Sequence, residues 1–278
     1  MFEIKYGAKM NLLDDKPLME KLDQSNQLSW IQNWESMFNQ AFDTGSSIKI
    51  PKKINIGKKE ITLNYSQKFS SIIVIGMGGS AISGDYLSSI LSREENFSTP
   101  VQVIRGYHIP KWVSLSTLVI AVSYSGNTRE TLTCLYKALQ VQASTILLSS
   151  GGTIEEVAKK YSIPWIKLPS GYQPRAAFPV IFGTIIGLFD KLFPTLTLSN
   201  KIKNIGNVIN NIITRFGPDQ PSTNNLSKNL ASKLHNKIPI IISSELALIT
   251  RWKGQINENS KMIAYMDVFP ELMHNSYY

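Results

Sequence analysis

The stretch Ser71-Ile-Ile-Val-Ile-Gly-Met-Gly-Gly-Ser-Ala81 decides the fold of this chain. An apolar, β-branched run enters a turn of Gly and Ser, and a helix-like segment follows. A second stretch, Thr117-Leu-Val-Ile-Ala-Val-Ser-Tyr-Ser-Gly-Asn-Thr128, has the same plan. Its run over 119–122 is apolar at every position, as a central parallel strand requires. The two stretches therefore predict strand–turn–helix units of one parallel sheet.

Strands and helices alternate through the first two thirds of the sequence. Alternation at this spacing predicts an α/β fold, doubly wound, with a parallel sheet flanked by helices on both faces. The expected strands are 71–75, 101–104, 117–122, 144–148 and 164–168, the expected helices between them are 80–92, 128–140 and 153–161, and a buried helix is expected over 179–193.

The ends of the chain suggest two further segments beside a first domain at 48–193. Residues 1–47 form an expected N-terminal helical segment, because apolar residues recur at helical spacing over 11–42. Its expected packed face consists of Leu18, Leu22, Trp30, Trp34, Phe38 and Phe42.

Residues 194–278 predict a partial second domain of the same type. It has an expected strand at 238–242, a helix at 246–259 and an apolar stretch over 262–268. So few elements cannot cover both faces of a sheet. We therefore expect this domain to be incomplete: it docks on the first domain, another chain completes it, or the sequence is truncated.

The composition favours a small acidic ligand. The 278 residues carry a formal net charge of +9, which suits acidic substrates, nucleic acid or an anionic membrane. The basic residues are dispersed rather than clustered, so we do not expect nucleic-acid binding. The longest apolar stretch, 176–189, is too short for a membrane span and contains Pro179. The single cysteine, Cys134, excludes an intrachain disulfide, fits a cytoplasmic protein and is expected to be a packed thiol.

The two turns together form a candidate anion site. Glycines let the backbone approach a ligand closely, and the helix N-termini that follow supply N–H groups and partial positive charge. A phosphate monoester is the anion that would use all of these groups. The expected binding residues are Gly78, Gly79, Ser80, Ser123, Ser125 and Thr128. Asn127 and Glu130 also fit a capping-box-like helix start.

Two other interpretations of these turns stay open. They could be ordinary turn and cap residues. They could also belong to a dinucleotide site, because Gly76, Gly78 and Ala81 satisfy G-x-G-x-x-A. In that case the next strand ends in Arg105, which suits only a 2′-phosphate. Neither turn is a P-loop, and no residues have metal-ligand spacing.

The second turn resembles the phosphate loop S-x-S-G-x-T of the sugar isomerase (SIS) domain. More narrowly, four motifs in order resemble those of the bifunctional phosphoglucose/phosphomannose isomerases of archaea and some bacteria. They are Gly76-Met-Gly-Gly-Ser80, Ser123–Thr131, Pro174-Arg-Ala-Ala177, and Asn257-Glu-Asn-Ser-Lys261 followed by Pro270-Glu-Leu-Met-His-Asn275. The resemblance covers residues from about 65 to His274.

The resemblance implies two SIS domains, a homodimer and metal-free isomerisation of hexose 6-phosphates through a cis-enediol, without a cofactor. The substrates implied are glucose 6-phosphate or mannose 6-phosphate and fructose 6-phosphate, and the sequence sets no preference between the first two. The phosphate loop would correspond to Gly79, Ser80, Ser123, Ser125 and Thr128, the sugar-side arginine to Arg175, the catalytic base to Glu258, and a ring-opening histidine, acting across the dimer interface, to His274.

One departure from that family bears on activity. Members continue for several tens of residues past the His-Asn pair and use a lysine and a threonine there, whereas this sequence ends at Tyr278. We therefore expect weak or absent isomerase activity for the chain alone. Two alternatives remain: a non-catalytic SIS module that binds a sugar phosphate or regulates a partner, and, less favoured, an NADP-dependent oxidoreductase.

Overall fold

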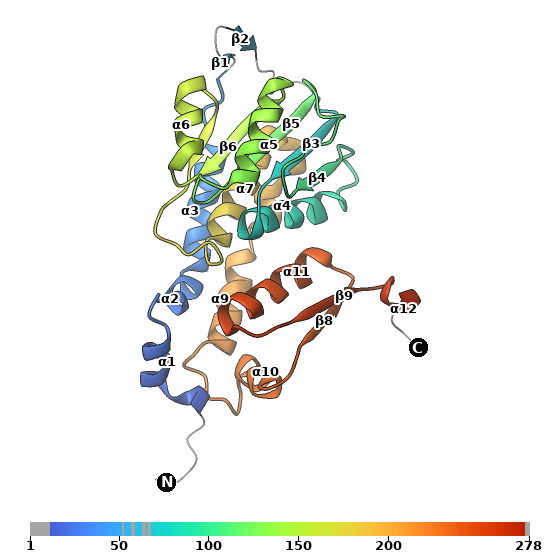
Figure 1. Cartoon of the computed structure of the whole chain (residues 1–278). Helices are drawn as coiled ribbons and strands as arrows, with labels where there is room; N and C mark the ends of the chain where they lie inside the picture. The colour runs from blue at the N-terminus through green and yellow to red at the C-terminus, as the bar shows by residue number, and fades with distance from the viewer. Residues whose placement is uncertain (1–11, 52, 57–58, 63–64, 66–67, 276–278) are drawn as a thin grey trace, which may run out of the picture. The chain divides into compact units, whose positions relative to one another are not determined.

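A computed structural model describes residues 12–51, 53–56, 59–62, 65 and 68–275 (Figure 1). By its internal contacts the chain divides into two compact units. One unit combines the N-terminal segment up to Glu35 with Asn204–Pro239, and the other combines Ser36–Lys203 with the segment from Ile240 onward. The domain boundaries expected from the sequence, 1–47, 48–193 and 194–278, stay a prediction.

The larger unit contains a five-stranded parallel sheet, which confirms the predicted fold class. The strand order is β4-β3-β5-β6-β7, so β3, the first of these five strands along the chain, lies inside the sheet rather than at its edge. Every residue of β3, β5 and β6 is buried, in agreement with their β-branched, non-alternating sequences. The strands are β3 (Ser71–Ile75), β4 (Val101–Ile104), β5 (Thr117–Val122), β6 (Ser144–Ser149) and β7 (Trp165–Lys167).

The register of the sheet brings the carboxyl ends of four strands to one edge. Ile75 at the end of β3 pairs with Ile104 of β4 and with Ala121 of β5. Val122 at the end of β5 pairs in turn with Leu148 of β6. The turns that follow these strands therefore begin side by side.

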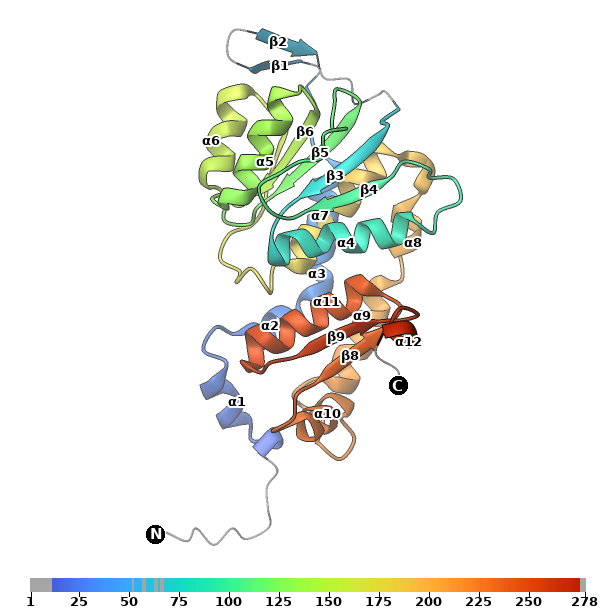
Figure 2. The ribbon, with the colours of Figure 1, turned by 45° about the vertical axis from the view of Figure 1, so that its right-hand side comes forward.

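Helices cover both faces of this sheet, as Figure 2 shows. On one face, α5 (Arg129–Gln140) and α6 (Gly152–Tyr161) pack on alternate residues of the strands, such as Ile73 and Val119. On the other face, α4 (Gly78–Leu91) lies so close to Val74 that a Cβ added at Gly84 would be 2.8 Å from its side chain. The cysteine prediction is confirmed, since Cys134 is fully buried in the first of these layers and burial raises the pKa of its thiol.

Two helices of this unit, α3 (Trp34–Ser46) and α7 (Phe178–Leu192), meet at backbone distance. A Cβ added at Gly187 would lie 2.0 Å from the carbonyl oxygen of Phe42, and one at Gly45 would lie 2.1 Å from that of Thr184. Glycine is therefore required at this crossing, because any side chain would separate the helices. The crossing fixes the predicted buried helix beneath the sheet.

Gly187→Ala should lower the free energy of unfolding by about 3 kcal/mol, because the new methyl group overlaps the backbone of α3. Chemical denaturation measures this change. The matched control is Gly254→Ala in a helix where an added Cβ meets no atom within 4 Å, and it should change stability by no more than about 1 kcal/mol. Equal effects of the two substitutions would contradict the close crossing.

The C-terminal part of the larger unit is a smaller parallel arrangement. β8 (Ile240–Ser243) pairs in parallel with β9 (Tyr265–Val268), and α11 (Leu246–Gln255) contacts both strands as well as α4. The expected strand, helix and apolar stretch are thus present, although the α-helix ends four residues earlier than expected. Ile240 and Ile242 remain exposed on the strand pair. The other elements of this unit are β1 (Lys53–Ile56), β2 (Lys59–Thr62), η2 (Pro194–Leu196), α8 (Leu198–Ile202) and α12 (Leu272–Asn275).

The smaller unit is helical, and the helical spacing over 11–42 is divided rather than continuous. The first helix ends just before Asp23. The carboxylate of Asp23 accepts hydrogen bonds from the backbone N–H groups of Gln27 and Leu28, and these bonds stabilise the start of the next helix. Asn26 has a positive φ of 53°, which no helix interior tolerates. Of the expected packed face, Phe38 is buried whereas Leu22 is exposed. The helices are η1 (Leu12–Asp14), α1 (Lys16–Leu22), α2 (Gln27–Gln32), α9 (Ile205–Phe216) and α10 (Leu226–Leu234).

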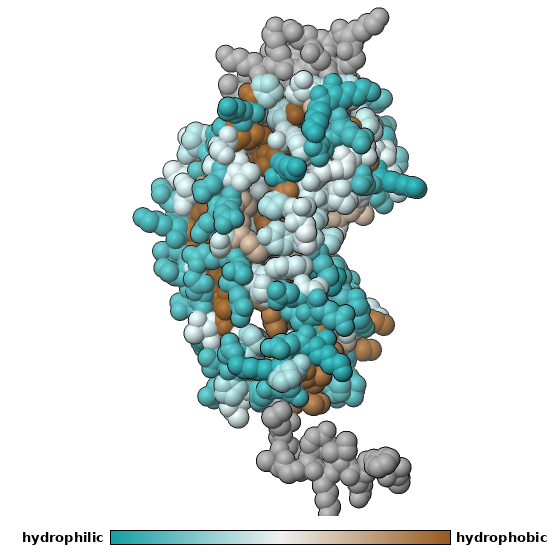
Figure 3. Space-filling model, turned by 90° about the vertical axis from the view of Figure 1, so that its left-hand side faces the viewer, coloured by the Kyte–Doolittle hydropathy of each residue, from teal (hydrophilic) through white to brown (hydrophobic). Residues whose placement is uncertain are grey.

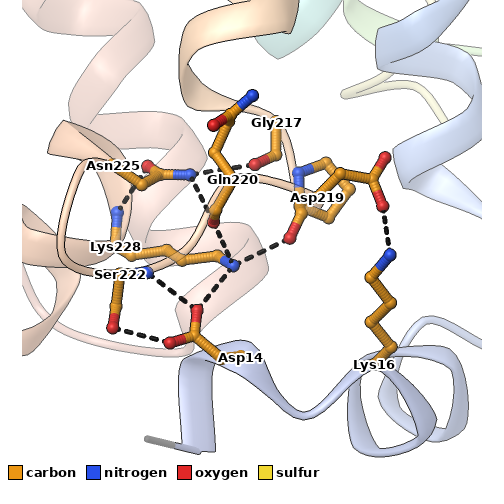
Figure 4. A network of polar contacts seen from close by, with 9 residues as sticks. Asp14, Lys16, Gly217, Asp219, Gln220, Ser222, Asn225 and Lys228 are labelled. Carbon is orange, nitrogen blue, oxygen red and sulfur yellow. Dashed lines mark hydrogen bonds and ion pairs between the residues drawn. The ribbon is translucent and has the colours of Figure 1, made fainter.

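A polar network joins the two sequence segments of the smaller unit (Figure 4). The Lys228 side chain is only 11% exposed, and its ammonium group donates to the carboxylate of Asp14 at 3.0 Å and to the carbonyl oxygens of Pro218 and Gln220. Ser222 donates its hydroxyl and its backbone N–H to the same carboxylate. Hydrogen bonds from Ser222 and then Lys228 lower the pKa of Asp14.

Because the folded-state pKa of Asp14 is lowered, its contribution to stability is present above the ordinary carboxyl pKa and is lost as the pH falls below that value. Asp14→Asn should therefore lower the melting temperature at pH 7 and flatten the loss of stability between about pH 5 and pH 2. Thermal unfolding across this range measures both effects. Asp43→Asn, at an exposed position of α3, is the control and should leave the acid profile unchanged. Parallel acid profiles for wild type and Asp14→Asn would contradict a structural role for the network.

On the face of the molecule shown in Figure 3, hydrophilic residues (teal) predominate and hydrophobic residues (brown) show between them. Among the helices that the structure describes, none combines the length and the apolar character needed to cross a membrane.

Candidate active site

The first two strand-end turns are joined by a hydrogen bond. The backbone N–H of Tyr124 donates to the Ser80 hydroxyl oxygen at 3.2 Å, although the two residues are 44 positions apart. Ser80 is buried in the first turn of α4, and Tyr124 directly follows Ser123. The sheet register therefore assembles the two predicted Ser-rich turns into one structure.

The second turn is held by its own hydroxyl groups. The Ser123 and Thr128 hydroxyl oxygens lie 2.9 Å apart, and Ser123 also accepts the backbone N–H of Gly126 at 3.1 Å. The Ser125 oxygen accepts the N–H of Asn127 at 3.3 Å, and Ser125 is exposed. Buried hydroxyls thus fix the loop, while its tip remains open to a ligand.

A third turn, after β6, packs on the second and was missed by the sequence prediction. The Ser150 hydroxyl donates to the carbonyl oxygen of Tyr124 at 2.7 Å. Gly126 has a φ of 74°, and a Cβ there would lie 1.8 Å from the carbonyl oxygen of Gly151. The run Ser149-Ser-Gly-Gly-Thr153 repeats the strand-to-Gly pattern of the first two turns, so the signal was present in the sequence.

This third turn also corrects the expected capping box. The Asn127 side-chain oxygen accepts the backbone N–H and the hydroxyl of Thr153 at 2.9 and 3.0 Å. Helix α5 begins after Thr128, and Glu130 instead accepts the hydroxyl of Tyr107. The capping-box prediction was wrong because Asn127 is engaged by a segment 26 residues away.

Beside the first turn lies a cavity of about 200 Å³ that combines four separate parts of the sequence. Four of the predicted site residues line it: Gly78 and Gly79 come from α4, Arg175 from the loop after β7, and Glu258 from the segment that follows α11. The full lining is Gly78, Gly79, Ile82, Arg105, Arg175, Thr250, Arg251, Gly254, Gln255 and Glu258.

The remaining predicted residues do not line this cavity. Ser80, Ser123, Ser125 and Thr128 belong to the adjoining turns described above. His274 is exposed in the short helix α12, where its backbone N–H donates to the carbonyl oxygen of Glu271.

The loop that carries Arg175 is fixed from two sides. On one side the α4 turn approaches so closely that a Cβ at Gly79 would be 2.8 Å from the carbonyl oxygen of Pro174. On the other side the Gln255 side-chain N–H donates to the carbonyl oxygen of Arg175 at 3.2 Å. Asn259 donates in turn to the side-chain oxygen of Gln255 at 2.7 Å. These contacts set the distance between the arginine and the helix that carries the carboxylate.

Glu258 lies in a wide helical turn. The α-helix ends at Gln255, and Ile256–Ser260 continues as a π-helical turn that stops at Lys261, with φ 55°. Such turns are rare and occur frequently at functional sites. Asn257 supports the turn by accepting the N–H of Ala264 at 3.0 Å.

Three guanidinium groups and one carboxylate among the lining residues make the cavity basic. Arg105 donates both terminal nitrogens to the carboxylate of Asp85. Arg251 lies over the ring of Phe178, 4.0 Å from its centroid. The sequence prediction considered Arg105 only for a dinucleotide and missed Arg251. A basic site beside N–H-rich turns can bind an anion and present a carboxylate to it.

Comparison with known proteins identifies the family. A bifunctional phosphoglucose/phosphomannose isomerase from Caldicellulosiruptor bescii is 39% identical over 245 residues, which are 87% of this chain and 70% of the relative. The chain belongs to the bifunctional phosphoglucose/phosphomannose isomerase family. A member from Thermoplasma acidophilum is 35% identical over 74% of this chain and 61% of its own length. Residues 223–277 also match the family model of the bacterial phospho-glucose isomerase C-terminal SIS domain.

Two further proteins resemble the chain, one in sequence and one in fold. A D-glucosamine-6-phosphate 4-epimerase from Sulfolobus acidocaldarius is 32% identical over 73% of this chain and 62% of its own length. The solved tagatose-6-phosphate ketose/aldose isomerase from Escherichia coli has a TM-score of 0.57 over 97% of this chain and 70% of its own, at 14% identity. That likeness supports the α/β fold predicted from the sequence.

The close approach at Gly79 generates a prediction. Gly79→Ala should displace the Pro174–Arg175 loop, because its Cβ would overlap the carbonyl oxygen of Pro174. The displaced loop would move Arg175 away from the ligand, and a lost hydrogen bond to a charged group costs about 1.5–3 kcal/mol, so we expect glucose 6-phosphate to bind at least tenfold more weakly, as measured by calorimetry.

Gly78→Ala is the matched variant. Its Cβ would meet no atom within 4 Å, although φ is 49°, so it should cost about 1 kcal/mol of stability with a smaller effect on binding. The argument from the loop would fail if Gly78→Ala weakened binding more than Gly79→Ala.

Proposed function

We propose that the chain catalyses aldose–ketose isomerisation between glucose 6-phosphate or mannose 6-phosphate and fructose 6-phosphate. The observation that carries this proposal is the cavity in which Gly79, Arg175 and Glu258 come together next to the joined Ser-rich turns. The names of the relatives agree with it.

The dianionic phosphate would bind at the joined turns. Backbone N–H groups at the start of α4, the exposed Ser125 hydroxyl and the other hydroxyls of the two turns suit three phosphate oxygens. The phosphate residues in this proposal are Gly78, Gly79, Ser80, Ser123, Ser125 and Thr128. With the phosphate held there, the sugar carbons would extend into the basic cavity.

The proposed chemistry is a proton transfer through a cis-enediolate, and it needs no metal. Glu258 takes the proton from C2 of the open aldose, the C–H electron pair forms the C1=C2 double bond, and the carbonyl pair moves to O1. Arg175 stabilises the negative oxygen. Glu258 then returns the proton to C1, while the O2 proton moves to O1 and C2 becomes the carbonyl carbon.

Ring opening is the part of the proposal that needs a second chain. His274 lies outside the cavity of its own chain. We infer a homodimer in which each His274 reaches the partner's cavity, where an imidazole suits proton transfer to the ring oxygen. A cytoplasmic location fits the single, buried cysteine.

Glu258→Gln tests the assignment of the base. It should lower turnover of fructose 6-phosphate by about 1,000-fold, because the amide cannot accept the carbon-bound proton. Glucose 6-phosphate formation is followed by coupled NADP reduction, and sugar-phosphate binding by calorimetry should change less than threefold. Glu156→Gln, an exposed carboxyl on α6, is the control with unchanged turnover.

The outcomes separate the alternative functions. Turnover that persists in Glu258→Gln would refute the proposed base. Sugar-phosphate binding by the wild-type chain without turnover would favour the non-catalytic module. Thermal stabilisation by NADPH instead of by a sugar phosphate would favour the oxidoreductase.

A further inference from the structure

Arg251 lines the same cavity as Glu258 but has no role in the chemistry described above. It lies on α11, four residues before Gln255 and seven before Glu258, and all three residues line the cavity. Arg251 and Gln255 are one turn apart and share one side of α11, and Glu258 follows in the π-helical turn. The cavity therefore places a cation beside the proposed base.

The guanidinium group of Arg251 packs on an aromatic ring that belongs to a cluster of rings. It lies 4.0 Å from the centroid of the Phe178 ring. That ring stacks on Phe182 at 5.2 Å with an interplanar angle of 10°, and it also contacts Tyr86 at 5.2 Å. A planar guanidinium on an aromatic face keeps its N–H edges available for hydrogen bonds. Its position is thus fixed before any ligand binds.

Arg251 differs from Arg105, the other arginine of the cavity whose partner is known. Arg105 is neutralised by Asp85, whereas no carboxylate forms an ion pair with Arg251 among the residues that the structure describes. Burial lowers the pKa of Arg251, and the charges of Tyr86 and Glu258 oppose that change. A partly buried cation without a paired anion is costly, and a negatively charged ligand group would offset this cost.

We propose that Arg251 is a second substrate-binding arginine, which donates hydrogen bonds to the C1 and C2 oxygens of the open-chain sugar as negative charge develops on them. The proposal rests on the proposed isomerase function. With the phosphate held at the Ser-rich turns, the reacting carbons lie near Glu258, and Arg251 lines the same cavity. Together with Arg175 it encloses the enediolate between two cations.

The test compares two five-carbon phosphates that differ only at C1. In 5-phosphoarabinonate a carboxylate copies the enediolate charge, and in arabinitol 5-phosphate a neutral hydroxymethyl group replaces it. By calorimetry, Arg251→Met should weaken binding of the carboxylate compound about 30-fold, the effect of losing charge-assisted hydrogen bonds. Binding of the neutral compound should change less than threefold.

Two further variants keep the test decisive. Arg251→Lys retains the charge without the planar fork, so its affinity for 5-phosphoarabinonate should lie between those of wild type and Arg251→Met. Lys253→Met removes a cation from the same helix outside the cavity and should bind both compounds as wild type does. If Arg251→Met does not fold, as judged by thermal unfolding, Arg251→Lys alone should still lose at least threefold for the carboxylate compound only.

Equal loss for both compounds, or no loss for either, would overturn the role of Arg251. A wild-type protein that binds neither compound would instead overturn the proposed function itself. The two failures are therefore distinguishable in the same experiment.

Discussion

The parallel register of β3, β5 and β6 is the constraint on which the rest of the structure depends. It aligns the carboxyl ends of the strands, so that the N–H of Tyr124 reaches the hydroxyl of Ser80. A slip by one residue would turn every buried side chain toward the opposite face and separate the turns. Because both faces of these strands are packed, such a slip would also change which side chain meets each covering helix, and so the close-packed core helps to determine the geometry of the polar edge.

Close backbone contacts also fix the lining of the cavity relative to the sheet. The α4 turn touches the loop after β7 at Gly79 because glycine has no side chain, and Gln255 holds the same loop from α11. Arg175 and Glu258 are 83 positions apart in sequence, but the hydrogen bond from the Gln255 side chain connects the loop of Arg175 directly to the helix that precedes Glu258. Because the lining carries three guanidinium groups, the site is basic before a ligand enters.

The sequence predicted the sheet well, because β-branched runs and regular alternation are local signals. It did not predict the division of the N-terminal helices, which depends on the side chain of Asp23 and on the conformation of Asn26. Asn127 was misjudged because its partner, Thr153, is distant in sequence. Arg251 could not be recognised in advance, since its orientation comes from Phe178 on another helix.

The π-helical turn at Ile256–Ser260 has a consequence for how this segment can change during evolution. A π turn closes each hydrogen bond one residue later than an α-helix, so it holds one residue more than the α-helical turn that it replaces. Deleting a residue between Gln255 and Glu258 would let the segment close as an ordinary helix and would remove the wide turn that presents the carboxylate. The segment can therefore exchange side chains more easily than it can lose a residue.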